Sequence, residues 1–230
     1  MMMFDDTYIM YLLVAMTIPL LAQLFLKSTF NRYRQVRASS GMTGAQVARR
    51  ILDRNGLQHV HLTETGGKLT DHYDPRSKSV RLSADIYQGT SVAAVAVAAH
   101  ECGHAIQHAE NYLPLQFRST LVPVVNIGSR LGYAVILIGF LTEAMGLAAI
   151  GIMLIGLIVI FQLITLPVEF NASSRAMEQL REINILHSSE ETKGARRVLT
   201  AAALTYVAAL IVALAQIARW IILLSRRNRR

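Results

Sequence analysis

The chain has 230 residues, 53% of them apolar, and its 23 Lys and Arg against 15 Asp and Glu give a net charge of +8. This length and apolar fraction favour one small, mostly α membrane protein over two soluble domains. The basic residues cluster beside the apolar segments and no nucleic-acid-reading module is present, so the charge indicates anionic lipid of a bilayer as the partner and excludes nucleic acid.

Residues 8–26 form the first apolar stretch, which carries no charged residue and is long enough to cross the ~30 Å core of a bilayer. Asp5 and Asp6 precede it, whereas a cleaved signal peptide would begin with positive charge. Basic residues follow it, beginning with Lys27 and Arg32. By the positive-inside rule, the N-terminus is expected outside the cell and residue 27 onward in the cytoplasm.

A polar region at residues 27–120 is predicted to fold as a small cytoplasmic α+β domain. Residues 43–52 predict a capped amphipathic helix. Three short strands of an antiparallel sheet are then predicted, separated by turns: 59–62, 68–70 and 79–82. Residues 71–74 are Asp-His-Tyr-Asp, and this pattern favours a polar turn at a strand edge over a second metal site. The strand near Val80 is a candidate edge along which a peptide substrate could lie as an added strand.

The next predicted helix, over residues 90–109, contains the most informative motif of the chain, the HExxH pattern His100-Glu101-Cys102-Gly103-His104. An α-helix turns about 100° per residue, so side chains four apart share a face. Two imidazoles one turn apart can bind one tetrahedral Zn²⁺. Glu101 is then placed beside the metal rather than on it. A general base that acts on a metal-bound water needs this neighbouring position.

Cys102 points about 200° away from His100 on this helix and is predicted to pack in the core. It is the only cysteine, so an intrachain disulfide is excluded, which fits a reducing cytoplasmic location. His108 continues the four-residue step but lies about 12 Å along the helix axis from His100, too far to share one zinc. Its role stays open between a contact to substrate or to a ligand and an ordinary surface histidine.

A second apolar block, residues 121–168, is long enough as helix, about 72 Å, for a transmembrane hairpin with a short outside turn. Residues 169–198 are then expected to form a helix in the cytoplasm. A third block, residues 199–224, either spans the membrane or lies at its interface with Arg219 reaching the headgroups, and four spans are favoured in total. A single crossing would place the basic tail, residues 225–230, outside, against the positive-inside rule.

A catalytic zinc needs a third protein ligand and an open position for water. The candidates after the motif are acidic or histidine side chains: His108, Glu110, Glu143, Glu169, Glu178, Glu182, His187, Glu190 and Glu191. Glu143 is expected across the bilayer, and His108 and Glu110 belong to the motif helix. Glu169 stands out because it directly follows a predicted span, on a helix whose next residues are small enough to pack closely against the motif helix. The alternative is a solvated glutamate at a helix start, stabilised by the helix dipole.

Four segments besides the N-terminal span carry a family resemblance: residues 69–75 (LTDHYDP), 98–108 (AAHECGHAIQH), 166–173 (LPVEFNAS) and 201–208 (AAALTYVA). With them the chain resembles the YugP-type neutral zinc metallopeptidases of bacterial membranes, and more distantly the HtpX-like membrane gluzincins, over nearly its whole length. The resemblance implies one Zn²⁺ per chain, held by His100, His104 and Glu169, with Glu101 as the base. HtpX-like proteins commonly carry Asp four residues after the Glu ligand, where this chain has Ser173.

The activity expected from this site is peptide-bond hydrolysis by a membrane-embedded zinc endopeptidase, in which Glu101 takes a proton from the zinc-bound water and passes it to the leaving amine. Tyr206 and Arg175 are candidates for stabilising the oxyanion, although Tyr206 is equally an interfacial anchor. The zinc is expected at the cytoplasmic surface of the cell membrane. The expected substrates are therefore membrane proteins or their juxtamembrane tails.

Two other functions remain open. A site-2-type intramembrane protease would carry HExxH within a spanning helix, but residues 90–99 are too short an apolar run, and Arg81 and Asp85 lie just upstream. A non-enzymatic membrane scaffold or transporter would carry the two histidines incidentally. The sequence identifies neither the substrate nor the oligomeric state.

Overall fold

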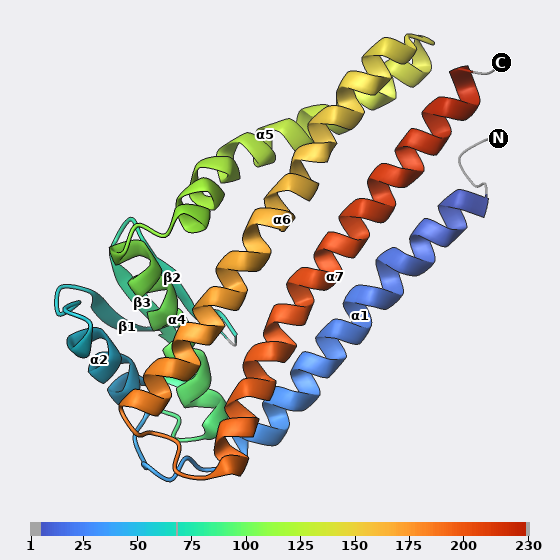
Figure 1. Cartoon of the computed structure of the whole chain (residues 1–230). Coiled ribbons are helices and arrows are strands. Elements are labelled where there is room, and N and C mark those ends of the chain that lie inside the picture. Colours follow the sequence, from blue (N-terminus) through green and yellow to red (C-terminus); the bar gives the residue numbers. More distant parts are fainter. Residues whose placement is uncertain (1–5, 68, 229–230) are drawn as a thin grey trace. The chain divides into compact units, whose positions relative to one another are not determined.

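The computed structural model describes residues 6–67 and 69–228, and Figure 1 shows its elements. In chain order these are α1 (Asp6–Arg34), α2 (Gly44–Arg54), β1 (His61–Thr65), β2 (His72–Asp74), β3 (Ser79–Ser83), α3 (Ala84–Tyr87), α4 (Val92–Ala109), α5 (Leu113–Leu141), α6 (Met145–Glu182) and α7 (Ser189–Asn228). Among the described residues, four helices are long and apolar enough to cross a membrane: α1, α5, α6 and α7. The predicted fold class is confirmed, a mostly α membrane protein with a small α+β part.

The described chain divides into two compact units. The first, here called the apolar unit, contains the part before residue 24, residues 116–166 and the part after residue 204. The second, here called the polar unit, contains residues 24–115 and 167–204. Helices α1, α5, α6 and α7 each supply residues to both units.

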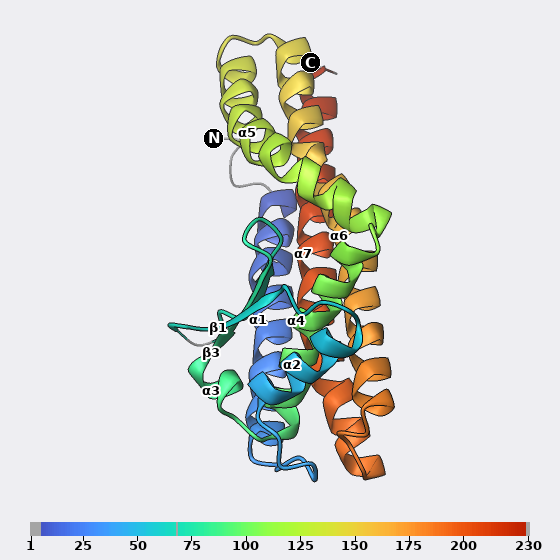
Figure 2. The same cartoon turned by 90° about the vertical axis from the view of Figure 1, so that its left-hand side faces the viewer.

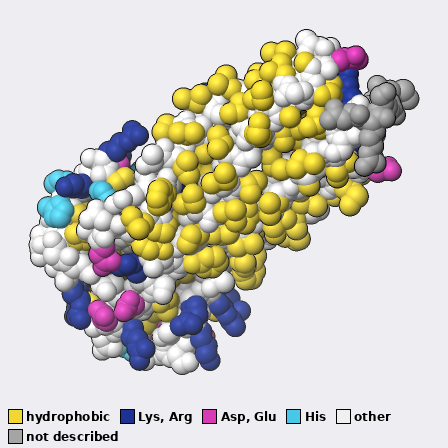
Figure 3. Space-filling model, turned by 45° about the horizontal axis from the view of Figure 1, so that its top comes forward, with side chains coloured by type: hydrophobic (Ala, Val, Ile, Leu, Met, Phe, Trp, Pro, Cys, Tyr) yellow, Lys and Arg dark blue, Asp and Glu magenta, His cyan; other side chains and the backbone are white. Residues whose placement is uncertain are grey.

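In the apolar unit, large hydrophobic side chains lie on the surface of the helices. Met10 and Met153 are each 67% exposed, and Leu137 is exposed as well. Figure 3 shows hydrophobic side chains over much of the face that it presents. A soluble protein rarely exposes so much apolar surface, and helices of this length and composition fit a bilayer core.

Helices α5 and α6 of the apolar unit pack closely through glycines. A Cβ atom added to Gly139 would lie 2.5 Å from the backbone nitrogen of Ala148, and one added to Gly151 would lie 2.8 Å from the carbonyl oxygen of Gly132. Small residues of this kind let two spanning helices approach at backbone distance. The turn between the helices contains Glu143 with a positive φ of 60°.

Helices α6 and α7 extend beyond the apolar blocks of the sequence. α6 continues through Pro167 to Glu182, and α7 begins at Ser189, so the helix predicted at 169–198 is two helical segments, each continuous with an apolar block. The missing N–H of Pro167 removes one helical hydrogen bond without ending the helix. The polar extension of α6 is stabilised by burial of Ala172, Ala176 and Leu180, a packing effect that hydropathy does not report.

The polar unit contains one described sheet with the strand order β1-β3-β2. β3 is parallel to β1 and antiparallel to β2, so the sheet is mixed and not antiparallel throughout as predicted. The sheet is mixed because the chain reverses its direction twice, once between β1 and β2 and once between β2 and β3. β1 and β3 therefore run in the same direction.

Two details of the predicted sheet are wrong. The second strand lies at His72–Asp74 rather than at residues 68–70, because Leu69 has a positive φ of 56°, which a strand residue does not adopt. Lys68, also in the predicted strand, lies outside the described residues. Val80 belongs to the central strand, paired on both sides, so the substrate edge predicted there is occupied by β1 and β2.

Helix α4 forms the centre of the polar unit. Ser91 caps it, its hydroxyl accepting a hydrogen bond from the Ala94 N–H. Helix α2, which begins at Gly44 after a reciprocal Thr43–Gln46 capping box, packs beside α4 (Figure 2). The alanine side chains of α4 are almost all inaccessible, and their small size lets neighbouring elements approach its axis from several sides.

Candidate metal centre

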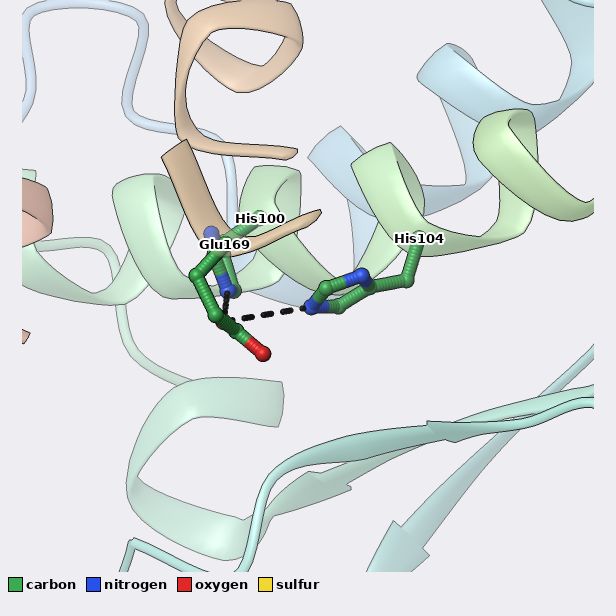
Figure 4. Close-up of side chains that lie close together, drawn as sticks. All are labelled: His100, His104 and Glu169. Atoms are coloured by element: carbon green, nitrogen blue, oxygen red, sulfur yellow. Dashed lines mark ion pairs between the residues drawn. The ribbon is translucent and has the colours of Figure 1, made fainter. Parts of the chain in front are cut away.

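Three side chains of the polar unit converge from two helices. His100 and His104 lie one turn apart on α4, and Glu169 lies on α6 (Figure 4). The Glu169 Oε2 atom is 3.3 Å from His100 Nε2 and 3.6 Å from His104 Nε2. Among the described residues, this is the group of histidine, cysteine and acidic side chains able to hold a metal ion, with ligand atoms within 4.8 Å of one another.

The dimensions of this group fit zinc. With ligand bonds of about 2.0–2.1 Å, tetrahedral coordination places neighbouring ligand atoms about 3.3 Å apart. The two measured distances from Glu169 Oε2, 3.3 and 3.6 Å, are close to this value. Two imidazole nitrogens and one carboxylate oxygen form a ligand set typical of catalytic zinc, and they leave a fourth position for water or substrate.

A close helix contact brings the third side chain to the histidines. A Cβ atom added to Gly103 of α4 would lie 2.6 Å from the carbonyl oxygen of Ala172 in α6. Any larger residue at position 103 would therefore separate the two helices. Since Gly103 lies inside the HExxH motif and Ala172 lies one turn after Glu169, the approach occurs where the three side chains meet.

Burial and hydrogen bonding shift the pKa values of Glu169 and His104 in opposite directions. Burial raises the pKa of Glu169, which is 2% exposed, but hydrogen bonds with His100 and His104 outweigh it and hold the pKa well below its usual range. For His104, burial lowers the pKa, and the hydrogen bond with Glu169 reverses this, so that the pKa is raised. Glu169 therefore keeps its negative charge in a buried position, which suits a cation.

The other residues of the motif take separate positions. Glu101 is buried, at 8% exposure, and is not a member of the three-residue group. Cys102 is fully buried and its Sγ donates to the carbonyl oxygen of Ala48 at 3.6 Å, as expected for a core residue. Burial raises the pKa of the Cys102 thiol, so the group is neutral and unsuited to bind a metal.

The remaining candidates from the sequence lie outside the group. The His108 Nδ1 atom is 2.8 Å from the Tyr73 hydroxyl of β2. The Arg175 guanidinium pairs with Glu110 at 2.6 Å. Tyr206 lies on the part of α7 that belongs to the apolar unit.

Residues 72–74 form strand β2 rather than the polar turn predicted there, and the polar side chains of residues 71–74 bond to nearby groups. The Asp71 carboxylate accepts hydrogen bonds from the Ser83 backbone and hydroxyl, and Asp74 accepts from the Arg76 backbone and the Ser77 hydroxyl. His72 Nδ1 contacts the carbonyl oxygen of Thr70 at 2.7 Å. These side chains form no metal group among the described residues.

Three residues around the group make contacts that the sequence did not predict. Gln107 Oε1 lies 2.9 Å from His104 Nδ1, and Gln107 Nε2 donates to Asn171 Oδ1 at 2.9 Å. Ser173 Oγ lies 3.3 Å from His100 Nδ1, at the position where HtpX-like proteins commonly carry Asp. The available signal for Gln107 is its i+3 spacing from His104, which places both on one face of α4.

Fold and site together define a helical membrane protein with a His-His-Glu centre of zinc-compatible dimensions. The chain belongs to the family described as "Putative neutral zinc metallopeptidase", whose model matches residues 8–225. It is 47% identical over 216 residues to the "Putative membrane protease YugP" of Bacillus subtilis (strain 168), a match that covers 94% of this chain and 96% of the relative. No solved structure matches the chain. Membership of a zinc metallopeptidase family implies zinc, and His100, His104 and Glu169 are the group able to hold it.

Proposed function

We propose that this protein is a membrane zinc endopeptidase in which His100, His104 and Glu169 bind one zinc ion per chain and Glu101 is the general base. The observation that carries the proposal is the position of the Glu169 carboxylate, 65 residues after His104 in sequence, within 3.6 Å of both Nε2 atoms. Family membership and the name of the Bacillus relative support the same activity.

Zinc bound at this group supplies Lewis acidity for the hydrolysis of a peptide bond. Glu101 then acts on the attacking water, accepting its proton and delivering it to the leaving amine. Its position supports this role, because Glu101 directly follows His100 on α4 and is 8% exposed. Arg175, in the polar unit with the metal group, is the candidate donor to the oxyanion.

The active site is proposed to face the cytoplasm, close to the membrane. The basic residues that follow the first apolar stretch support this orientation by the positive-inside rule. The two segments predicted to be cytoplasmic, 27–120 and 169–198, nearly coincide with the ranges of the polar unit, 24–115 and 167–204. Substrates within reach of such a site are membrane proteins and membrane-proximal segments, which we propose as the substrate class.

An intramembrane protease of the site-2 type is less well supported. Its HExxH motif would lie in a spanning helix, whereas α4 is an 18-residue helix packed against α2, α3 and the sheet. Among the described residues, α4 is not one of the four helices with the length and composition of a span. The non-enzymatic scaffold is distinguished from the peptidase by the zinc content of the protein, which the following experiment measures.

The test compares wild type with Glu101→Gln in the full-length protein, measuring zinc content and cleavage of a panel of membrane proteins. Glu178→Gln, an exposed glutamate on α6, is the matched control. We expect stoichiometric zinc in all three proteins and loss of cleavage by about 10²- to 10⁴-fold in Glu101→Gln alone. Unchanged cleavage in Glu101→Gln would contradict the mechanism, and no zinc in any of the three would favour the scaffold.

A further inference from the structure

The side chain of Gln107 is fully buried and connects the two helices of the metal centre. Its Oε1 atom lies 2.9 Å from His104 Nδ1 on its own helix. Its Nε2 atom donates to two oxygens of α6, the Val168 carbonyl and Asn171 Oδ1, each at 2.9 Å. The amide thus contacts one proposed ligand directly and the residue immediately before another.

The hydrogen-bond network determines which way this amide points. Arg175 Nε can only donate, so the Asn171 atom 2.8 Å from it must be the acceptor Oδ1. The Val168 carbonyl oxygen can also only accept. The Gln107 atom that faces both oxygens must therefore be the NH₂ group, and the amide oxygen must face His104.

This direction determines the tautomer of a neutral His104. The Gln107 oxygen has no proton to donate, so the hydrogen bond at 2.9 Å requires the proton on His104 Nδ1. The lone pair of the imidazole is then on Nε2, the atom that faces Glu169 Oε2. A zinc ligand must present that lone pair. The arrangement at His100 is less specific, because the Ser173 hydroxyl is 3.3 Å from Nδ1 and can donate or accept.

We infer that Gln107 is a positioning residue: it holds His104 in the Nδ1–H tautomer that a zinc ligand needs and couples the orientation of this ring to the segment of α6 that carries Glu169. The inference rests on the proposed zinc site. Hydrogen bonds of this kind behind a metal ligand typically change metal affinity 10- to 100-fold when removed.

Three substitutions separate this role from ordinary packing. Gln107→Met keeps the length of the side chain and removes every hydrogen bond. Gln107→Glu keeps an acceptor for His104 Nδ1–H and loses the donations to Val168 and Asn171. Gln179→Met is the matched control, since Gln179 on α6 accepts a hydrogen bond from Asn55 and contacts no proposed ligand in the described network.

The measurement is zinc affinity of the full-length proteins by competition with a chelator, together with the absorption spectrum of the Co²⁺-substituted forms. We expect affinity to fall about 10- to 100-fold in Gln107→Met with an altered cobalt spectrum, to fall less in Gln107→Glu, and to be unchanged in Gln179→Met. If Gln107→Met does not fold, Gln107→Glu alone decides: a loss of zinc affinity below about tenfold supports the inference, and any larger loss overturns it.

The outcomes distinguish this inference from the proposed function. Wild type that binds neither zinc nor cobalt overturns both. Wild type and Gln107→Met that bind zinc equally overturn the inference and leave the proposed function standing. Equal losses in Gln107→Met and Gln107→Glu overturn it as well, because they show that the amide connects the helices without acting through His104.

Discussion

Gly103 and Ala172 are in contact at a distance that permits no side chain on Gly103, since an added Cβ atom would lie 2.6 Å from the Ala172 carbonyl oxygen. The obstacle is backbone on the facing helix, which cannot move aside as the end of a flexible side chain can. The HExxH helix and the helix of Glu169 are thereby kept at the separation that the His-His-Glu group needs.

Enlarging Gly103 should separate the metal ligands. We expect Gly103→Ala to cost about 1–3 kcal/mol of stability, the usual range for overpacking, and Gly103→Val to lose zinc binding. Thermal unfolding and zinc content measure the two effects. Gly156→Ala on α6 is the control, because an added Cβ there meets nothing within 4 Å, so it should keep wild-type zinc content and should not lower the Tm. Wild-type zinc affinity in Gly103→Val would show that the close approach is not required.

Removing the metal should lower the stability of the wild-type protein. A ligand that binds the folded state at 100 times its Kd stabilises it by about 2.7 kcal/mol, so a chelator should lower the Tm measurably. In His104→Ala, zinc and chelator should make no difference to the Tm. If wild type and His104→Ala respond alike to the chelator, the metal is bound elsewhere.

His108 should be unnecessary for metal binding. Its Nδ1 atom is 2.8 Å from the Tyr73 hydroxyl, and it is not a member of the metal group. We expect His108→Gln to retain stoichiometric zinc, whereas His100→Gln loses it. A loss of zinc in His108→Gln with the Tm unchanged would make His108 a ligand and contradict the assignment of Glu169.

Glu191 should stabilise the polar unit in a pH-dependent way. Its carboxylate, 6% exposed, accepts hydrogen bonds from the Ser39 hydroxyl and from the backbone N–H groups of Ser39 and His187 at 2.9 and 2.8 Å. Burial raises the pKa of Glu191, but these hydrogen bonds outweigh it, so that the pKa is lowered from its ordinary value of 4.5. A lowered pKa in the folded state gives stability that is present above the ordinary pKa and is lost as the pH falls through the folded pKa.

We therefore expect Glu191→Gln to lose about 1–3 kcal/mol at neutral pH, with the difference from wild type shrinking below about pH 4. Thermal unfolding at several pH values measures it. Glu190→Gln, an exposed neighbour on the same helix, should behave as wild type throughout. A Glu191→Gln deficit that stays constant down to low pH would mean that the charge of Glu191 is not the cause.

Local signals predicted much of this molecule. The HExxH spacing predicts the motif helix, and the length of the apolar block after α4 predicts two further long helices, because periodicity and hydropathy are properties of short segments. Glu169 could be singled out from nine candidates because it directly follows a predicted span and precedes small residues, and in the structure its carboxylate lies beside both histidines.

What could not be predicted depends on contacts between distant segments. The position of β2 depends on the positive φ of Leu69 and on pairing with β3, and neither is encoded in the alternation of residues. The predicted helix after residue 168 continues without a break from the apolar block, as the single helix α6, and ends at Glu182. Gln107 looked like an ordinary polar residue on a helix, since its partners Val168 and Asn171 lie more than sixty positions away.

The arrangement on α4 has a consequence for finding such sites in other sequences. At about 100° per residue, His100, Gly103, His104 and Gln107 fall within an arc of about 100°, whereas Glu101 and Cys102 fall outside it. Toward α6 these four residues contribute two side chains able to hold a metal, one gap for the facing backbone and one amide that connects the helices. The pattern HExGHxxQ is therefore a stricter fingerprint than HExxH, because it specifies the partner helix as well as the ion.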